Sequence, residues 1–234
     1  MIGRNSGRSF FHMLQPRFEK RYSSGLNLLT NFQWSKMIEQ MSRLNPQSPS
    51  LEHPIADEDR PLRFVVSGTY DLPFGKGKPM LSNTNGFVSR LVGGWQMNAI
   101  YIAQSGGPLD WTDRNIIFFR GDLQLDPNMV DRVAFDTTRF ETAANRQLDR
   151  NFRYFPTRFG NLRAAGVNNL DTSLIKNTFV TERFNIQFRA EMFNSLNRTQ
   201  FNGPELNPTN ANFGRITSAA NLPRAVQLAL RLRW

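Results

Sequence analysis

The side chains that could do chemistry are few in this chain, and they form no recognisable catalytic or metal-binding pattern. Only two histidines, His12 and His53, are present, and there is no cysteine. A metal site usually needs several His, Cys or acidic ligands at fixed spacing, and a nucleophile–histidine–acid triad needs a histidine beside both partners. We expect His12 to lie on a strand and His53 in a loop, with no catalytic residue, no metal site and no cofactor.

Two other groups of residues suggest binding sites, but their spacing favours simpler interpretations. The segment G-K-G-K at 75–78 is shorter than a phosphate-binding loop and has no Ser or Thr after its lysine, so we predict a turn. Four aspartates could offer oxygen ligands to calcium: Asp110, Asp113, Asp122 and Asp126. Their spacing matches no ordered calcium loop, and we expect them to be solvated acids.

The charge of the chain suggests a polyanion as partner, but its distribution does not. The formal net charge is +10, and the 29 Lys and Arg residues are spread along the chain with no dense basic run beyond Lys76 and Lys78. In a membrane barrel such residues would line the lumen or face lipid phosphates. We therefore expect no nucleic-acid partner. The lack of cysteine excludes a disulfide framework.

The segment 224–234, R-A-V-Q-L-A-L-R-L-R-W, shows the pattern on which the fold prediction depends. Alternation with period 2 places one set of side chains on a single face of a strand: Val226, Leu228, Leu230, Leu232 and Trp234. The other face is polar or small. A strand of about 9–11 residues spans a bilayer when tilted, with aromatic rings at the interfaces. The segment is therefore interpreted as a membrane-barrel strand, although a strand of a soluble sheet can show the same division.

Six further segments show similar alternation and are predicted as strands: 9–21, 26–35, 60–72, 94–105, 169–177 and 184–194. Pro16 lacks a backbone donor and predicts an edge or bulge in the first of them. The polar faces give the candidates for a lumen-facing wall: Gln187, Arg189, Glu191, Gln96 and Asn98. The predicted fold is all-β, an antiparallel transmembrane barrel segment of about seven strands that is incomplete on its own.

The connections between these strands alternate between short and long. Outer-membrane barrels have short periplasmic turns and long outer loops, so 23–25 and 177–183 are predicted as periplasmic, and 39–59, 106–168 and 195–223 as outer loops. The connector 73–93 is long for a periplasmic turn. On this topology, aromatic residues of the apolar face lie near the two interfaces: Trp34 at the outer one, and Tyr70, Trp95, Phe184 and Trp234 at the periplasmic one.

Seven strands cannot close a membrane barrel, because single-chain bacterial barrels have even numbers of strands from eight upwards. The amino end lacks the apolar stretch of a signal peptide. We therefore expect residues 1–234 to be the carboxyl part of a longer barrel domain. Mean hydropathy is −0.47 and no apolar run is long enough for a membrane-spanning helix.

Several motifs, in order, resemble the Oar-like TonB-dependent receptors, which carry an amino-terminal carboxypeptidase-regulatory-like domain. They are E-K-R-Y-S-S-G-L-N-L-L-T-N-F-Q-W-S-K at 19–36, S-G-T-Y-D-L-P-F-G-K-G at 67–77, G-G-W-Q at 93–96, Q-S-G-G-P-L at 104–109, R-F-N-I-Q-F-R-A-E-M-F-N-S-L-N at 183–197 and F-G-R-I-T-S-A at 213–219. The resemblance implies the closing third of a barrel of roughly 22 strands, with a plug in its lumen. The plug, the regulatory-like domain and the TonB box are not recognised in this sequence.

The same resemblance implies a function and a set of partners. The function is uptake of a large nutrient, such as a siderophore, a carbohydrate or a peptide, in the bacterial outer membrane. The partners are membrane lipid and lipopolysaccharide, and the TonB complex only through amino-terminal regions. Family members often end in Phe, so Trp234, with Leu232 and Leu230, is expected to serve recognition by the barrel-assembly machinery. Two alternatives stay open: a passive porin or adhesin-type barrel, and a soluble β-sandwich module that binds carbohydrate.

Overall fold

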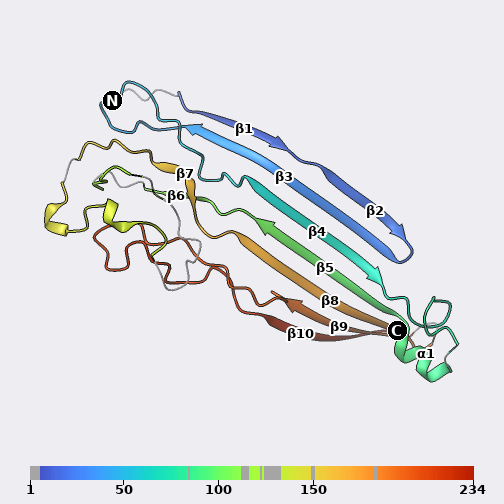
Figure 1. Cartoon of the computed structure of the whole chain (residues 1–234). Coiled ribbons are helices and arrows are strands. Elements are labelled where there is room, and N and C mark those ends of the chain that lie inside the picture. The colour runs from blue at the N-terminus through green and yellow to red at the C-terminus, as the bar shows by residue number, and fades with distance from the viewer. Residues whose placement is uncertain are drawn as a thin grey trace.

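A single antiparallel sheet forms most of the molecule (Figure 1). The computed structural model describes residues 6–83, 85–111, 116–121, 123, 133–148, 151–181 and 184–234. The strand order of the sheet is β1-β3-β4-β5-β8-β9-β10, and β2 also pairs with β3. The bounds are β1 Arg8–Leu14, β2 Arg17–Ser23, β3 Leu26–Gln40, β4 Leu62–Asp71, β5 Trp95–Gln104, β8 Val167–Phe179, β9 Asn185–Phe193 and β10 Ala225–Arg233. The predicted all-β antiparallel fold, not closed on its own, is confirmed.

The first predicted strand is divided into two, which corrects the single strand expected over 9–21. β1 and β2 both pair with β3, and the break falls at Gln15 and Pro16. Pro16 has no backbone N–H to give to the sheet, but its carbonyl accepts a hydrogen bond from the amide of Phe32 at 3.1 Å. The two halves therefore occupy one strand position, and the sheet has seven such positions.

A tight hairpin connects β2 to β3. Ser24 and Gly25 have φ values of 53° and 80°, as a type I′ turn requires, and Ser23 pairs with Leu26 across it. Gly25 is needed here for a second reason, since a Cβ atom would lie 3.0 Å from the carbonyl oxygen of Asp71 in β4. The turn predicted from S-S-G is thus present, and a register shift between Lys20 and Ser23 separates it from the regular pairing of β2 with β3.

The register divides the sheet into an apolar and a polar face. One cross-strand row, from β10 to β3, contains only apolar side chains: Leu228, Ala190, Leu174, Met97, Tyr70 and Leu26. The adjacent row, on the opposite face, contains only polar ones: Gln227, Glu191, Ser173, Asn98, Thr69 and Asn27. The alternation seen in each strand is therefore aligned across the whole sheet.

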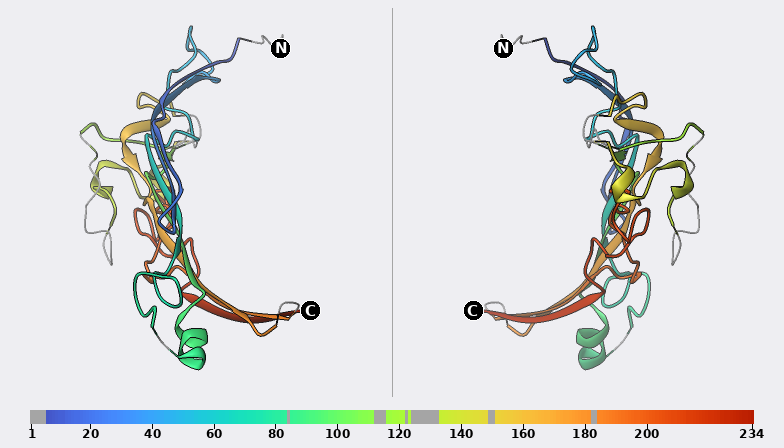
Figure 2. Two further views of the ribbon diagram at one scale, coloured as in Figure 1. Left: turned by 90° about the vertical axis from the view of Figure 1, so that its right-hand side faces the viewer. Right: turned by 90° about the vertical axis from the view of Figure 1, so that its left-hand side faces the viewer.

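The sheet is an open, curved arc (Figure 2), and the contact of Lys176 with the helix α1 (Gly86–Val92) identifies the convex face as the apolar one. This helix lies on the convex side, and Lys176, which belongs to the apolar face, donates a hydrogen bond to the carbonyl of Arg90 in that helix. No second protein layer covers this face in β10, where Leu230 is 66% exposed. An exposed apolar surface of this extent requires a lipid or protein partner.

The strand connections segregate to the two ends of the sheet (Figure 1). The hairpin turn, the connector with α1 and the link between β8 and β9 lie at one end, and the three long connections lie at the other. The predicted boundaries were partly wrong: residues 39–40 belong to β3, and 167–168 belong to β8. Those residues continue the ladder because their backbone groups still find partners in β1 and β5.

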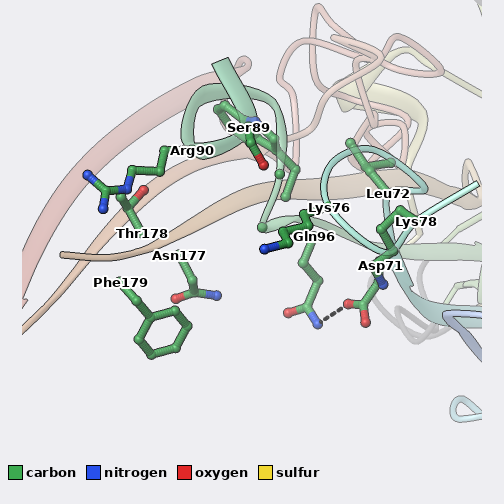
Figure 3. A pocket seen from close by; sticks show the side chains of 13 residues that line it. Asp71, Leu72, Lys76, Lys78, Ser89, Arg90, Gln96, Asn177, Thr178 and Phe179 are labelled. Atoms are coloured by element: carbon green, nitrogen blue, oxygen red, sulfur yellow. Dashed lines mark hydrogen bonds between the residues drawn. The ribbon is translucent and has the colours of Figure 1, made fainter. Parts of the chain in front are cut away.

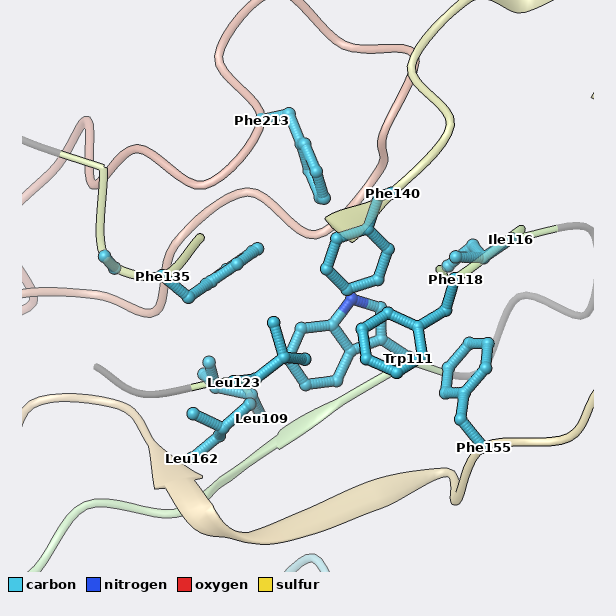
Figure 4. Close-up of a cluster of buried hydrophobic side chains, with 11 residues drawn as sticks. Leu109, Trp111, Ile116, Phe118, Leu123, Phe135, Phe140, Phe155, Leu162 and Phe213 are labelled. Carbon is cyan, nitrogen blue, oxygen red and sulfur yellow. The ribbon is translucent and has the colours of Figure 1, made fainter. Parts of the chain in front are cut away.

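The longest of these connections has a packed interior, which the sequence interpretation as a loop over 106–168 missed. It contains the strands β6 (Pro108–Asp110) and β7 (Arg158–Arg163) and the short 3-10 helices η1 (Thr137–Arg139) and η2 (Ala144–Arg146). A cluster of buried side chains joins it to residue 213 (Figure 4): Leu109, Trp111, Ile116, Phe118, Leu123, Ala134, Phe135, Phe140, Phe155, Leu162 and Phe213. We call this unit the cap. Its core is held by aromatic packing rather than by a regular sheet.

The connector between β4 and β5 contains α1, which the sequence interpretation did not predict. Asn85 begins the helix, with its side-chain oxygen accepting a hydrogen bond from the amide of Val88 at 3.1 Å. The helix ends at Gly93, whose amide donates to the carbonyl of Ser89. Among the described residues, no helix has the length and apolar character to cross a membrane.

Candidate functional site

The concave face of the sheet carries a connected set of polar side chains. Asn98 donates to Ser173 at 3.0 Å, and Gln187 donates to Asn177 at 2.9 Å. Arg189 forms an ion pair with Glu191 at 2.7 Å. All five predicted lumen-facing residues lie on this face. Four of them form these pairs, and the fifth, Gln96, donates a hydrogen bond to Asp71. We call this surface the polar wall.

Asp71 is the acidic centre of the polar wall near the end with α1, and it was not among the predicted lumen-facing candidates. Its carboxylate accepts hydrogen bonds from Gln96 at 2.9 Å and from the hydroxyl of Tyr22 at 2.5 Å. Alternation alone assigned Asp71 to the polar face. Its partners could not be predicted, because they depend on the register of β2, β4 and β5.

Two polar atoms of the wall are buried without a protein partner among the described residues: Nε of Arg189 and Oδ1 of Asn185. Buried polar groups are nearly always hydrogen-bonded. The wall also contains an apolar patch, in which Val65 pairs with Ile102, and Ile100 lies nearby. The polar wall therefore presents polar side chains and a small apolar patch on the same face.

Ion pairs attach the cap to the adjoining segment 39–61. Arg158 in β7 forms ion pairs with Asp110, at 2.5 Å, and with Glu39 in β3. Burial alone would lower the pKa of Arg158, but the hydrogen bonds that its guanidinium donates to Glu39 and Asp110 outweigh this effect and leave its pKa raised. The guanidinium therefore stays charged and holds β6 and β7 against the end of β3.

A further ion pair of the cap involves a more deeply buried carboxylate than the two ion pairs of Arg158 do. Arg163 in β7 contacts Asp59 at 2.6 Å, and the side chain of Asp59 is only 2% exposed. The same carboxylate accepts the amide of Met37 at 2.6 Å. A hollow of about 810 Å³ opens beside this pair, lined by the last residues of β1, by residues 34–36 of β3 and by β7. This hollow is a candidate binding site at the junction of the sheet and the cap.

The remaining predicted candidates have structural roles or simple positions. Residues 75–78 form a turn closed by the amide of Lys78 on the carbonyl of Gly75, as predicted. His12 lies in β1, and His53 lies in a loop beside Gln40. Asp110 is bound by Arg158, while the other three aspartates considered for calcium lie outside the described residues.

The predicted interface aromatics follow the strand ends. Trp34 lies towards the end of β3 that carries the cap. Tyr70 and Trp95 lie on the apolar face at the end with α1, and Phe184 and Trp234 flank β9 and β10 at that same end. Trp234 is 93% exposed, and Leu232 and Leu230 pair with Ile186 and Phe188. Their contact with membrane components stays a prediction.

These features define a sector of a transmembrane β-barrel, with an apolar convex face, a polar concave face and two free edges. Among the described residues, the apolar face of β10 is not packed against a second sheet, as it would be in a soluble sandwich. The chain belongs to the outer membrane beta barrel domain family, whose model matches residues 2–227. This family membership places the protein in the bacterial outer membrane. No curated protein and no solved structure matches the chain.

Proposed function

We propose that this segment forms part of the wall of a TonB-dependent outer-membrane receptor of the Oar-like type. The observation that carries the proposal is the shallow arc of the sheet, which is still wide open after seven strand positions (Figure 2). A barrel of about eight strands would be almost closed at that point. The curvature therefore favours a large barrel, and barrels of about 22 strands are outer-membrane transporters with a plugged lumen.

The composition of the polar wall supports a plugged barrel over a passive pore. A water-filled pore has a polar interior, whereas this wall carries an apolar patch around Ile100, whose side chain is 48% exposed. A folded plug can cover this patch and exclude water from it. The wall would then be a docking surface for the plug, which moves when transport is energised.

The proposed partners follow from the two faces and the two ends. Lipid and lipopolysaccharide contact the apolar face, and the assembly machinery recognises the strand that ends in Leu230, Leu232 and Trp234. The TonB complex contacts only regions outside this segment. The nutrient, a siderophore, a carbohydrate or a peptide, enters past the cap. No catalytic step is proposed for any residue.

Conductance of the full-length protein in a planar bilayer tests this proposal. A plugged receptor is expected to conduct almost no ions in the absence of TonB, whereas a passive porin conducts steadily. A second measurement is chemical cross-linking of the full-length protein to the periplasmic part of TonB. A steady open-pore conductance together with no cross-link would contradict the receptor and favour the porin alternative.

A further inference from the structure

A positively charged pocket lies at the end of the sheet that carries α1 (Figure 3). It has a volume of about 450 Å³ and lies between the turn at 75–78, the end of α1 and the ends of β4, β5 and β8. Its charged lining residues are Lys76, Lys78, Arg90 and Asp71. Three cations against one carboxylate make the pocket suited to an anion.

The carboxylate of this pocket is already engaged. Asp71 accepts hydrogen bonds from Tyr22 and from Gln96 of the polar wall. Trp95 and Thr178 line the same pocket from the apolar face, so the pocket extends around the end of the sheet from one face to the other. Among the residues that the structure describes, the side chains of Lys76 and Arg90 form no ion pair. Both cations are therefore available to a phosphate group, to which Arg can bind through two parallel hydrogen bonds.

An apolar groove adjoins the pocket. It has a volume of about 390 Å³, is lined only by apolar side chains, and shares Leu72 and Trp95 with the pocket. Leu174 and Trp95 belong to the convex, apolar face, and Leu91 of α1 forms the opposite side. The groove therefore opens on the lipid-facing surface, directly beside the cationic pocket.

The helix α1 is placed as an interfacial helix would be. Phe87 is 76% exposed and Leu91 is 56% exposed, although both are apolar. The indole nitrogen of Trp95 donates to the carbonyl of Leu91 at 3.0 Å, which ties the helix to the first residue of β5. Short amphipathic segments of this kind bury their apolar residues at the headgroup level. This position explains the length of a connector that joins adjacent strands.

We infer that the pocket and groove together bind one anionic phospholipid of the periplasmic leaflet. The phosphate lies among Lys76, Lys78 and Arg90, and one acyl chain lies in the groove between α1 and the sheet. Neither part alone requires a lipid, but their junction at Trp95 matches a molecule with a charged head and an apolar tail. This inference depends on the membrane location and not on the transported nutrient.

Native mass spectrometry of the full-length protein tests the site. The protein is reconstituted in vesicles of equimolar phosphatidylglycerol and phosphatidylethanolamine, extracted in mild detergent and weighed with its retained lipid. The intact protein is expected to retain one phosphatidylglycerol. The triple variant Lys76→Ala, Lys78→Ala and Arg90→Ala is expected to bind it on the order of a hundred-fold more weakly, because each basic residue near a membrane contributes roughly five-fold.

The matched control removes three cations at the opposite end of the sheet: Arg43→Ala, Arg146→Ala and Arg215→Ala. It should retain phosphatidylglycerol like the intact protein. A second variant, Leu91→Ser, leaves all three pocket cations in place and should weaken retention through the groove alone. Circular dichroism verifies that each variant is folded. Equal retention by the intact protein and both pocket variants would overturn the inference.

Competition separates a lipid from a free anion. Inorganic phosphate, which has the charge but no acyl chain, should displace phosphatidylglycerol only at concentrations far above those of a short-chain phosphatidylglycerol. Equal displacement by the two competitors would show that the pocket binds soluble anions and would contradict a lipid site. Retention of phosphatidylethanolamine in preference to phosphatidylglycerol would contradict the selection for an anionic headgroup.

Discussion

The ammonium nitrogen of Lys176 lies 5.4 Å from the centre of the Trp95 ring, on the apolar face of the sheet. The same nitrogen donates to the carbonyl of Arg90 at 2.6 Å and to the carbonyl of Gly93. These carbonyls lie at the carboxyl end of α1, where the helix dipole favours a cation. A lysine is thus accommodated on the apolar face because the carbonyls at the helix terminus and the indole ring stabilise its charge.

Replacing Lys176 with methionine is expected to loosen α1 without disturbing the ladder. The variant loses hydrogen bonds from a charged donor, each worth roughly 1.5–3 kcal/mol. Hydrogen exchange at the amides of Ser89 and Gly93 should become faster, while exchange in β8 stays unchanged. Lys20→Met, another cation of the apolar face, is the control. Unchanged exchange in α1 of the Lys176 variant would show that the contact does not hold the helix.

Val66 and Ser67 are neighbours in β4 that point to opposite faces, which makes them a matched pair. Val66→Arg puts a charge on the convex face in the middle of the strand and should cost roughly 2–4 kcal/mol of unfolding free energy in a bilayer. Ser67→Arg puts the same charge on the polar wall and should cost far less. Urea titration of the full-length protein in vesicles measures both, and equal costs would contradict a lipid-facing convex surface.

Arg163→Ala is expected to detach the cap from segment 39–61. Asp59, 2% exposed, would be left without its ion-pair partner, and breaking a buried pair costs roughly 3–5 kcal/mol. Protease added to intact cells should cleave the cap of this variant faster, with the barrel still assembled. Arg146→Ala removes an arginine whose side chain is 73% exposed and should leave cleavage unchanged. Resistance equal to the intact protein would mean that other contacts suffice.

Trp111→Ala should unfold the cap core itself. The Trp111 ring lies 5.6 Å from Phe135 and from Phe159, and 6.0 Å from Phe140. Truncation of a buried aromatic side chain costs roughly 3–5 kcal/mol. The cap should lose protease resistance even though its ion pairs are intact. Phe152→Ala, at a residue that is 62% exposed, is the control and should have no effect.

The strands of the sheet could be predicted because apolar and polar side chains alternate along each of them, as expected for a sheet with one apolar and one polar face. In β9, Phe188 and Ala190 alternate with Gln187 and Arg189, and the structure places the two sets on opposite faces. The S-S-G turn was equally readable, since positive φ values favour such residues. The break between β1 and β2 and the exact ends of the strands were harder to predict from the sequence. They depend on whether the adjacent strand still provides backbone hydrogen-bond partners.

The cap and α1 could not be predicted from alternation. The cap core collects Trp111, Phe140 and Phe213 from distant positions without a repeating period. The abundance of phenylalanine in that stretch was the available signal, and it indicated a buried cluster rather than an irregular loop. The wall pairs, such as Asn98 with Ser173, likewise depend on register between strands far apart in sequence.

The free edges of the sheet have a consequence for how the polypeptide must be handled before it reaches its membrane. Among the described strands, β1 and β10 each pair on one side only. In water, a sheet with one exposed apolar face and two unpaired edge strands is expected to aggregate with its own copies. When residues 1–234 are produced alone, we therefore expect them to form inclusion bodies. In the cell, we expect the protein to require a chaperone while it crosses the periplasm.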